Sequence, residues 1–468
     1  MEKTKKWSSI FPSILSGAGT KDAGPEEKAM RQGVNTYLIS SHDKTALQFS
    51  FPLLIPALPD VVVDSRPEGR DGAVAAIIER IKADARRNSG LHPLAGIGTR
   101  HPMHYEVTIE PCTLIHAPQG VGGHLWRADH CNRFDEKGLH LEIHGALPHP
   151  GLPTTGTIRA LHKVFSNLIQ AITDETTRVP ESVLAQWMAC SLDQKLLRDR
   201  LSDLGLVAFI GDGTRPAREN TEHRSYFRIA GRKSGVHIPF HCPEELTPEE
   251  IVLEGSNETI TGLGIRENEA FAIIGSNAQG KSTLLQAVIA GVDDHTPGDG
   301  REYVVTRPGA AFPQASGSGL ADADVSLFFR SLPPGVDGTV TSAGGRGSGS
   351  LIMADQIQQA LRKSAPLLFI DEDKAAANLL IPSCIKTEDV RPLSEILATD
   401  RPALNGSAFV FAASSMDLLI AEADRILLLV DHKAGSISRE QYRENLIGYL
   451  ITVCDLLRTG RCSCSEER

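Results

Sequence analysis

The sequence predicts an α/β protein, with a parallel sheet in its C-terminal half and a mixed α/β domain before it. Two apolar runs, at residues 269–274 and 367–370, have the length and continuous hydrophobicity of buried parallel strands. The first run leads into a glycine loop and a helix-forming segment, and the second ends in two acidic residues. The first half of the chain shows alternating runs and amphipathic segments, which indicate a separate mixed domain.

Composition and charge set the class of protein. The 468 residues exceed one usual hydrophobic core, so we expect two or three domains. No apolar run reaches the roughly 18 to 20 residues that cross a bilayer, so we expect no membrane-spanning segment. The net charge of −10 is unfavourable for broad binding to nucleic acid, and the eight scattered cysteines indicate a reducing compartment. We expect a cytoplasmic protein, with mitochondrial targeting by the basic N-terminus as the alternative.

Extended segments and helices alternate in the first half. Residues 48–56 are apolar but contain two prolines, so we expect them at the edge of a sheet. The remaining pattern predicts strands at 105–109 and 139–144 and helices at 72–88, 157–172 and 183–204.

Three polar residues share one face of the strand predicted at 139–144. His140, Glu142 and His144 lie two residues apart, and the side chains of a strand alternate with period two. They could converge on a metal ion, or they form the solvated face of a half-buried strand, which is the commoner situation.

The glycine loop after the first apolar run fits the phosphate-loop pattern G-x-x-x-x-G-K-[ST] at every fixed position. Its glycines let backbone N–H groups approach phosphates at the positive end of the following helix. Lys281 would reach the β- and γ-phosphates of ATP, and the Ser282 hydroxyl would bind Mg²⁺. The nucleotide-binding residues that we predict are Gly275, Ser276, Asn277, Ala278, Gln279, Gly280, Lys281, Ser282 and Thr283.

A small antiparallel layer is expected over this site. A strand at 206–210 runs into a glycine turn, and residues 214–260 are polar with short strands at 225–229 and 235–240. Tyr226 or Phe240 could stack on adenine, or each is an ordinary core aromatic.

The second apolar run supplies the acidic half of the site. Asp371 and Glu372 stand at its carboxyl end, where ligands collect in open α/β sheets. We predict that Asp371 holds Mg²⁺ and that Glu372 polarises the attacking water.

Ser348-Gly349-Ser350 opens a predicted helix at 351–363 that leads into the acidic strand. This arrangement resembles the signature motif of ATP-binding-cassette (ABC) ATPases, where the serine and the helix N-terminus meet the γ-phosphate held by another subunit. The resemblance adds Ser348, Gly349 and Ser350 to the nucleotide-binding residues and implies a homodimer. It also gives Lys281, Ser348 and Glu372 the catalytic roles.

Two further stretches narrow the resemblance. Residues 262–265 and 297–306 are similar to the predicted ATPases of the ABC class, in which a cassette follows a family-specific N-terminal domain. This implies an ABC-type P-loop NTPase core with an antiparallel β layer, preceded by a mixed α/β N-terminal domain. We divide the chain into a partly disordered extension (1–70), the family-specific domain (71–215), the ATPase domain (216–450) and a tail (451–468).

Some positions depart from the family pattern and lead us to expect slow hydrolysis. Polar residues are expected after the signature motif, but this chain has Leu351, Ile352 and Met353 there. Ser414 occupies the position of the switch histidine of transporter cassettes, and Gln314 is a weak match to their metal-sensing glutamine. Each loss removes a polar contact that can be worth roughly 10²-fold in rate.

The function hypothesis is a soluble ABC-class ATPase that binds Mg-ATP, hydrolyses it slowly and closes as a dimer. One alternative is an ATP-dependent biosynthetic or phosphoryl-transfer enzyme that acts on an unknown small molecule. Another is an ATP-driven clamp on RNA or DNA, which the acidic net charge does not favour. A scaffold that binds nucleotide without turnover would differ from the first hypothesis only in rate.

Overall fold

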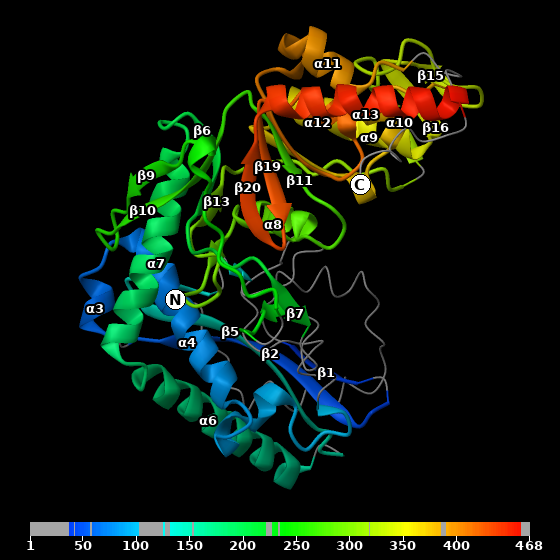
Figure 1. The fold of residues 1–468 in the computed structure, drawn as a ribbon. Helices are drawn as coiled ribbons and strands as arrows, with labels where there is room; N and C mark the ends of the chain where they lie inside the picture. The colour runs from blue at the N-terminus through cyan, green and yellow to red at the C-terminus, as the bar shows by residue number, and fades with distance from the viewer. Residues whose placement is uncertain are drawn as a thin grey trace.

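The computed structural model describes residues 37–102, 125–126, 132–151, 154–220, 227–317, 319–384 and 390–459, with residues 42, 57, 58, 233 and 234 left out. The strand predicted at 105–109 lies outside these residues. Figure 1 shows the N-terminal helices and strands in a lower lobe and the parallel strands in an upper one. No helix within these ranges is both long and apolar enough to cross a membrane.

The lower lobe is a four-stranded antiparallel sheet packed against helices. Its strand order is β1-β2-β5-β4, and alternate strand residues form one core with the helices. The strands are β1 (Tyr37–Ser40), β2 (Ala46–Ile55), β4 (Arg133–Asp135) and β5 (Gly138–Pro148). The helices are α3 (Asp60–Val63), α4 (Arg70–Asp84), α6 (Thr155–Thr177) and α7 (Glu181–Arg200), with 3₁₀ turns at Pro67–Gly69 and Ser89–Ala95.

The prediction that residues 48–56 lie at a sheet edge is wrong for residues 48–50, which pair on both sides; in the described part of the chain, residues 51–55 pair with β5 alone. Strand β2 lies between β1 and β5 and pairs along its whole length with β5. The proline is tolerated because β1 pairs only with residues 47–50, so Pro52 lies beyond its end and interrupts no β1–β2 pairing.

A second antiparallel sheet, of order β13-β6-β10-β9, confirms the predicted antiparallel layer. It contains β6 (Leu206–Gly211), β9 (Glu249–Val252), β10 (Thr259–Arg266) and β13 (Val304–Thr306). The expected strand at 235–240 is absent from the described structure, where these residues are irregular. The smaller pairs are β7 (Arg218–Asn220) with β8 (Phe227–Ile229), and β12 (Asp294–His295) with β3 (Leu125–Trp126).

The upper lobe is built on a five-stranded sheet of order β17-β18-β11-β19-β20, in which only β20 is antiparallel. Its strands are β11 (Ala270–Ile274), β17 (Leu367–Asp371), β18 (Ala408–Ala413), β19 (Arg425–Val430) and β20 (Lys433–Ile437). The helices are α8 (Lys281–Ala290), α9 (Gly349–Arg362), α10 (Ala377–Leu380), α11 (Leu393–Thr399), α12 (Asp417–Ile420) and α13 (Arg439–Thr459). A small sheet holds β14 (Gly319–Ala323), β15 (Asp337–Thr339) and β16 (Ser342–Arg346).

Both faces of the parallel sheet are covered, which explains why its strands read as continuous apolar runs. On β11, Ala272 and Ile274 pack in one cluster with α9 and α11, whereas Phe271 and Ile273 pack in another with α8, β6 and β10. The antiparallel layer therefore shares a core with the phosphate-loop strand.

The predicted domain boundaries do not fall at breaks in the structure. The boundary at 70 separates β2 from β5, and the boundary at 215 separates β6 from β10 and β13, although these strands pair with each other. Helix α13 also continues past residue 450. Sheet pairing joins segments that composition alone places in different domains.

Candidate nucleotide-binding site

The loop between β11 and α8 has the conformation that its glycines allow. Gly275, Ala278 and Gly280 have positive φ angles of 151°, 63° and 94°. A Cβ on Gly275 would lie 2.5 Å from the carbonyl oxygen of Leu429, so the loop packs closely on the end of β19. Ala278 adopts the left-handed conformation despite its side chain, which is a local strain held by the surrounding structure.

Lys281 folds back over the loop at the N-terminus of α8. Its Nζ donates hydrogen bonds to the carbonyl oxygens of Gly275 at 2.7 Å and Ser276 at 2.9 Å. Both acceptors are neutral. The ammonium charge therefore has no anion among these partners, and it adds to the positive end of the helix dipole.

A cavity of about 340 Å³ opens between this loop and the carboxyl ends of β17 and β18. Most of the predicted site residues line it, together with Asp373, Ala412 and Ser414. The residues that line it from the loop and the acidic strand are Asn277, Ala278, Gln279, Gly280, Lys281, Ser282, Thr283, Asp371 and Glu372. Gly275 and Ser276 contribute behind the lining, through their carbonyl contacts with Lys281.

Ser282 and Asp371 fit a magnesium ion. The Ser282 Oγ and the Asp371 Oδ1 lie 3.5 Å apart, and both are oxygen donors of the kind that Mg²⁺ takes. Burial raises the pKa of Asp371, and the neighbouring Asp373 carboxylate adds to this effect, which outweighs a hydrogen bond from the Asp373 backbone. A cation would favour the ionised form of Asp371.

Glu372 is held by two serines that follow β18. Its carboxylate accepts hydrogen bonds from the Ser414 Oγ at 3.0 Å and the Ser415 backbone N–H at 3.3 Å, and also from the Ser415 hydroxyl and the Ser414 N–H. Burial alone raises the pKa of Glu372, but these hydrogen bonds, led by that of Ser415, outweigh it and lower the pKa below its usual value. The sequence identifies Ser414 as the residue at the switch position, but it does not predict the hydrogen bonds between Ser415 and Glu372.

The Ser-Gly-Ser motif lies away from this cavity in the same chain. Ser348 is the N-cap residue of α9 and makes no side-chain cap hydrogen bond, while Ser350 Oγ donates to Asn378 at 2.7 Å. Gly349 packs on Ala315, whose carbonyl oxygen would lie 2.8 Å from an added Cβ. The structure therefore does not bring these three residues to the phosphate loop of their own chain.

A second cavity, of about 300 Å³, adjoins the first and shares Ala278, Gln279, Gly280 and Thr283 with it. Its other walls include the apolar side chains of Val236, Ile238 and Phe240 and the polar side chains of Arg218 and His432. Phe240 is only 6% exposed, so it serves the core and the cavity wall together. Tyr226, the other predicted aromatic, lies outside the described residues.

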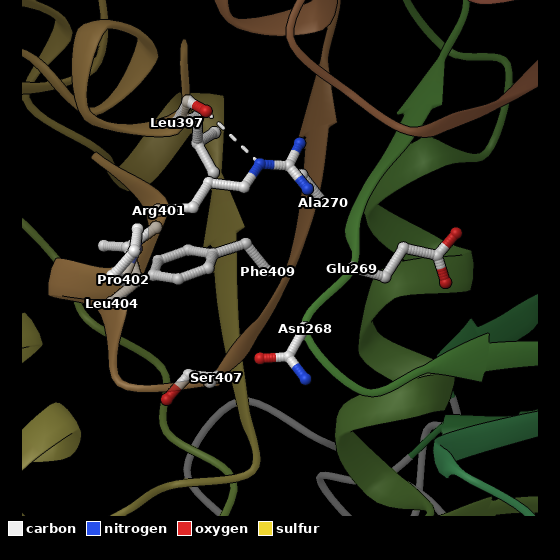
Figure 2. A pocket seen from close by; sticks show the side chains of 10 residues that line it. Asn268, Glu269, Ala270, Leu397, Arg401, Pro402, Leu404, Ser407 and Phe409 are labelled. Atoms are coloured by element: carbon white, nitrogen blue, oxygen red, sulfur yellow. Dashed lines mark hydrogen bonds between the residues drawn. The ribbon is translucent and has the colours of Figure 1, made fainter. Parts of the chain in front are cut away.

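A third cavity, of about 240 Å³, lies at the amino ends of β11 and β18. Figure 2 shows Arg401 in its wall, donating to the carbonyl oxygen of Leu397. The same guanidinium pairs with Asp424, and Glu269 pairs with Arg425. These charges already have partners, and this is the sheet end opposite to the one where ligands collect.

The histidine-rich strand forms ordinary polar pairs. His140 Nε2 lies 2.8 Å from Asp135, and His144 Nε2 lies 3.7 Å from Glu142. Among the residues whose placement is described, no group of three histidine, cysteine or acidic side chains could hold a metal ion. The structure thus gives the metal hypothesis for His140, Glu142 and His144 no support.

The glycine loop, its lysine and the facing carboxylates define a P-loop nucleotide-binding protein. The family profile of the ABC ATPases, described as a P-loop domain, matches residues 180–447, which is more than half of the chain. An uncharacterized protein of Methanocaldococcus jannaschii is 35% identical over 431 residues, covering 89% of this chain and 94% of the relative. The chain belongs to the ABC ATPase family, and the predicted ABC-type α/β core is confirmed.

Solved structures of ABC proteins are also similar to this chain. The cbiO1 protein of Clostridium perfringens, part of the ABC transporter complex cbiONQ, is 13% identical, with 55% of this chain and 97% of that chain covered and a TM-score of 0.30. A nucleotide-free ATP-binding cassette from an ABC transporter is 13% identical, with 51% and 95% covered and a TM-score of 0.30. These scores are too low to add to the family assignment.

Proposed function

We propose that the protein binds Mg-ATP in the phosphate-loop cavity, hydrolyses it slowly and closes as a homodimer around it. Family membership indicates ATP binding and hydrolysis in general. The observation that carries the proposal is the cavity that Lys281 and Asp371 line together, with the Ser282 hydroxyl 3.5 Å from the Asp371 carboxylate.

The two adjoining cavities fit the two halves of a nucleotide. The phosphates occupy the larger cavity, where loop N–H groups, the start of α8 and Lys281 supply positive charge. The nucleoside extends into the neighbouring cavity, whose apolar wall of Val236, Ile238 and Phe240 suits a purine ring. Lys281 leaves its carbonyl partners for the phosphates, because an ionic partner gives a stronger hydrogen bond than a neutral one.

Ser282 and Asp371 would hold the magnesium ion, which would supply positive charge against the phosphates during phosphoryl transfer. Glu372 stands beside them and accepts a hydrogen bond from the attacking water. Its lowered pKa keeps it ionised at neutral pH but makes it a weak base. Its oxygens are also engaged with Ser414 and Ser415, so water competes for them and turnover is slow.

The position of the Ser-Gly-Ser motif supports the proposed dimer closure. Ser348 is the N-cap residue of the 14-residue helix α9, and its side chain makes no cap hydrogen bond to that helix. A second copy would present Ser348 and the N-terminus of its α9 to the γ-phosphate, where hydroxyl, backbone N–H groups and helix dipole favour the negative charge. The closed dimer would bury the phosphates from water.

Calorimetric titration with ATP and magnesium tests the binding step. The parent protein should take up ATP, and Lys281→Ala should bind at least about 100-fold more weakly, because a charge-assisted phosphate contact is lost. Lys363→Ala, at the far end of α9, is the matched control and should bind like the parent. Absence of ATP uptake by the folded parent would reject the proposal.

A further inference from the structure

The β19–β20 hairpin has a strained two-residue turn beside the phosphate loop. Val430 pairs with Lys433, so the turn consists of Asp431 and His432, and both have positive φ angles, of 49° and 62°. Two-residue hairpin turns of this kind favour glycine at the second position, because a side chain there is costly. A bulky histidine in this conformation is the kind of strain that gathers at ligand sites.

The turn rests directly on the loop. The backbone N–H of His432 donates to Oε1 of Gln279 at 3.3 Å, and a Cβ built on Gly280 would lie 3.7 Å from Nδ1 of His432. The close approach of Leu429 to Gly275 fixes the end of β19 against the same loop. The imidazole of His432 is therefore held beside the residue that immediately precedes α8.

His432 lines the smaller cavity and not the phosphate cavity. Gly280 lines both, so the imidazole stands just past the point where they join. The charged side chain of Arg218, which also lines the smaller cavity, is engaged with Asp299 through a hydrogen bond of 2.9 Å. A ligand in this cavity would thus meet both an apolar wall and the imidazole of His432.

We infer that His432 contacts the nucleoside half of the bound nucleotide and makes the site prefer a nucleoside triphosphate to bare tripolyphosphate. The inference rests on the proposed function, because it assumes that the phosphates occupy the neighbouring cavity. The imidazole supplies a hydrogen-bonding edge for the ribose and a flat face for the base. In this inference the imidazole side chain of His432 contacts the ligand, and the conformation of the turn only places it there.

Glycine substitution separates the side chain from the turn, because glycine adopts both φ angles freely. His432→Gly should weaken ATP binding about 10-fold in calorimetry, as expected for one hydrogen bond with its contacts, and leave tripolyphosphate binding unchanged. Its melting temperature should equal or exceed that of the parent. Asp431→Gly relaxes the other turn residue, which lines neither cavity, and should bind both ligands like the parent.

Three results would overturn the inference. Unchanged ATP affinity in His432→Gly, with the parent binding ATP, would remove His432 from the site and leave the proposed function intact. Equal losses of ATP and tripolyphosphate would show that the turn only positions the phosphate loop. No ATP uptake by the parent would reject the proposed function and this inference with it. If the glycine substitution loosens the hairpin, His432→Asn replaces it as the test variant, because asparagine tolerates the same φ. Its ATP and tripolyphosphate affinities are then compared with those of the parent in the same way.

Discussion

Two charged regions of the molecule differ in how their charges are paired. Around Asp299, positive and negative groups neutralise each other in the interior. Arg301 donates to its carboxylate at 2.7 and 3.1 Å and Arg218 at 2.9 Å, and none of the Asp299 side chain is exposed. At the phosphate loop, Lys281 donates to two neutral carbonyl groups and faces an open cavity. Buried charges that pair with each other serve the fold, whereas charged groups that lie apart around a cavity are available to bind a ligand.

The pKa values of Asp299 and His295 reflect this pairing in the interior. Burial alone raises the pKa of Asp299, but the His295 ring, 3.2 Å from its carboxylate, and the hydrogen-bonded, positively charged Arg301 guanidinium outweigh burial and hold the pKa well below its usual range. Burial lowers the pKa of His295 to about 4, so the ring is neutral near pH 7. A second buried ion pair lies nearby in the sequence, where Arg198 of α7 donates to Asp294 at 2.9 Å. Val305, in the stretch 297–306 that supported the family resemblance, packs with Leu197 and Leu201 at the end of α7, so this stretch helps to connect the two lobes.

Removing Asp299 should have the largest effect on stability. Asp299→Ala leaves Arg218 and Arg301 buried beside each other without their anion, and should lower the free energy of unfolding by about 3–5 kcal/mol. Denaturation in urea measures this change.

Glu68→Ala is the control for removal of any carboxylate. Glu68 forms an exposed pair with Arg66 at 3.9 Å, so its loss should cost less than about 1 kcal/mol. Similar values for Asp299→Ala and Glu68→Ala would contradict the structural role of the buried cluster.

Replacement of Glu372 should affect turnover and spare the fold. Glu372→Gln removes the proton acceptor, so ATP hydrolysis should fall by roughly 10²–10³-fold while ATP stays bound. Phosphate release measures the rate, and light scattering with Mg-ATP should show a larger dimer fraction than in the parent.

Asp373→Asn changes the adjacent carboxylate of the same cavity and should keep at least a tenth of the parent rate. Adding Ser348→Ala to Glu372→Gln should reduce the dimer fraction, since the serine would cap the γ-phosphate of the other copy. A Glu372→Gln protein that hydrolyses ATP at the parent rate would remove Glu372 from its role.

Local patterns predicted the loop and the acidic strand because each lies within a few consecutive residues. Lys281 and Ser282 follow their glycines directly, and Asp371 ends its own strand. The order of the strands carries no such signal. Ser415 reaches Glu372 because β18 lies beside β17, and the two residues are 43 positions apart in the chain.

Because strand order carries no local signal, the sequence also misled on Pro52 and gave little warning of His432. Pro52 argued for an edge strand, but its cost depends on how far the neighbouring β1 extends. His432 had no motif around it, and its place beside Gly280 depends on the pairing of β19 with β11. Its one sequence signal is a two-residue turn, Asp-His, without the glycine that such hairpins favour.

The smallest predicted effect concerns the pH dependence of hydrolysis. Glu372 acts as a carboxylate, so the rate falls as pH decreases through its pKa, and the lowered pKa places this loss at low pH. Ser415→Ala removes the strongest of the hydrogen bonds that lower the pKa. The acid limb of the rate profile should therefore move to higher pH, by about half to one unit. Ser407→Ala, which removes a hydroxyl bonded to Ala365 at the opposite end of β18, should leave the limb in place. An acid limb that stays fixed in Ser415→Ala would mean that the ionisation of Glu372 does not set the limb. The hydrogen bond from Ser415 to Glu372 would then have a structural role and no role in hydrolysis.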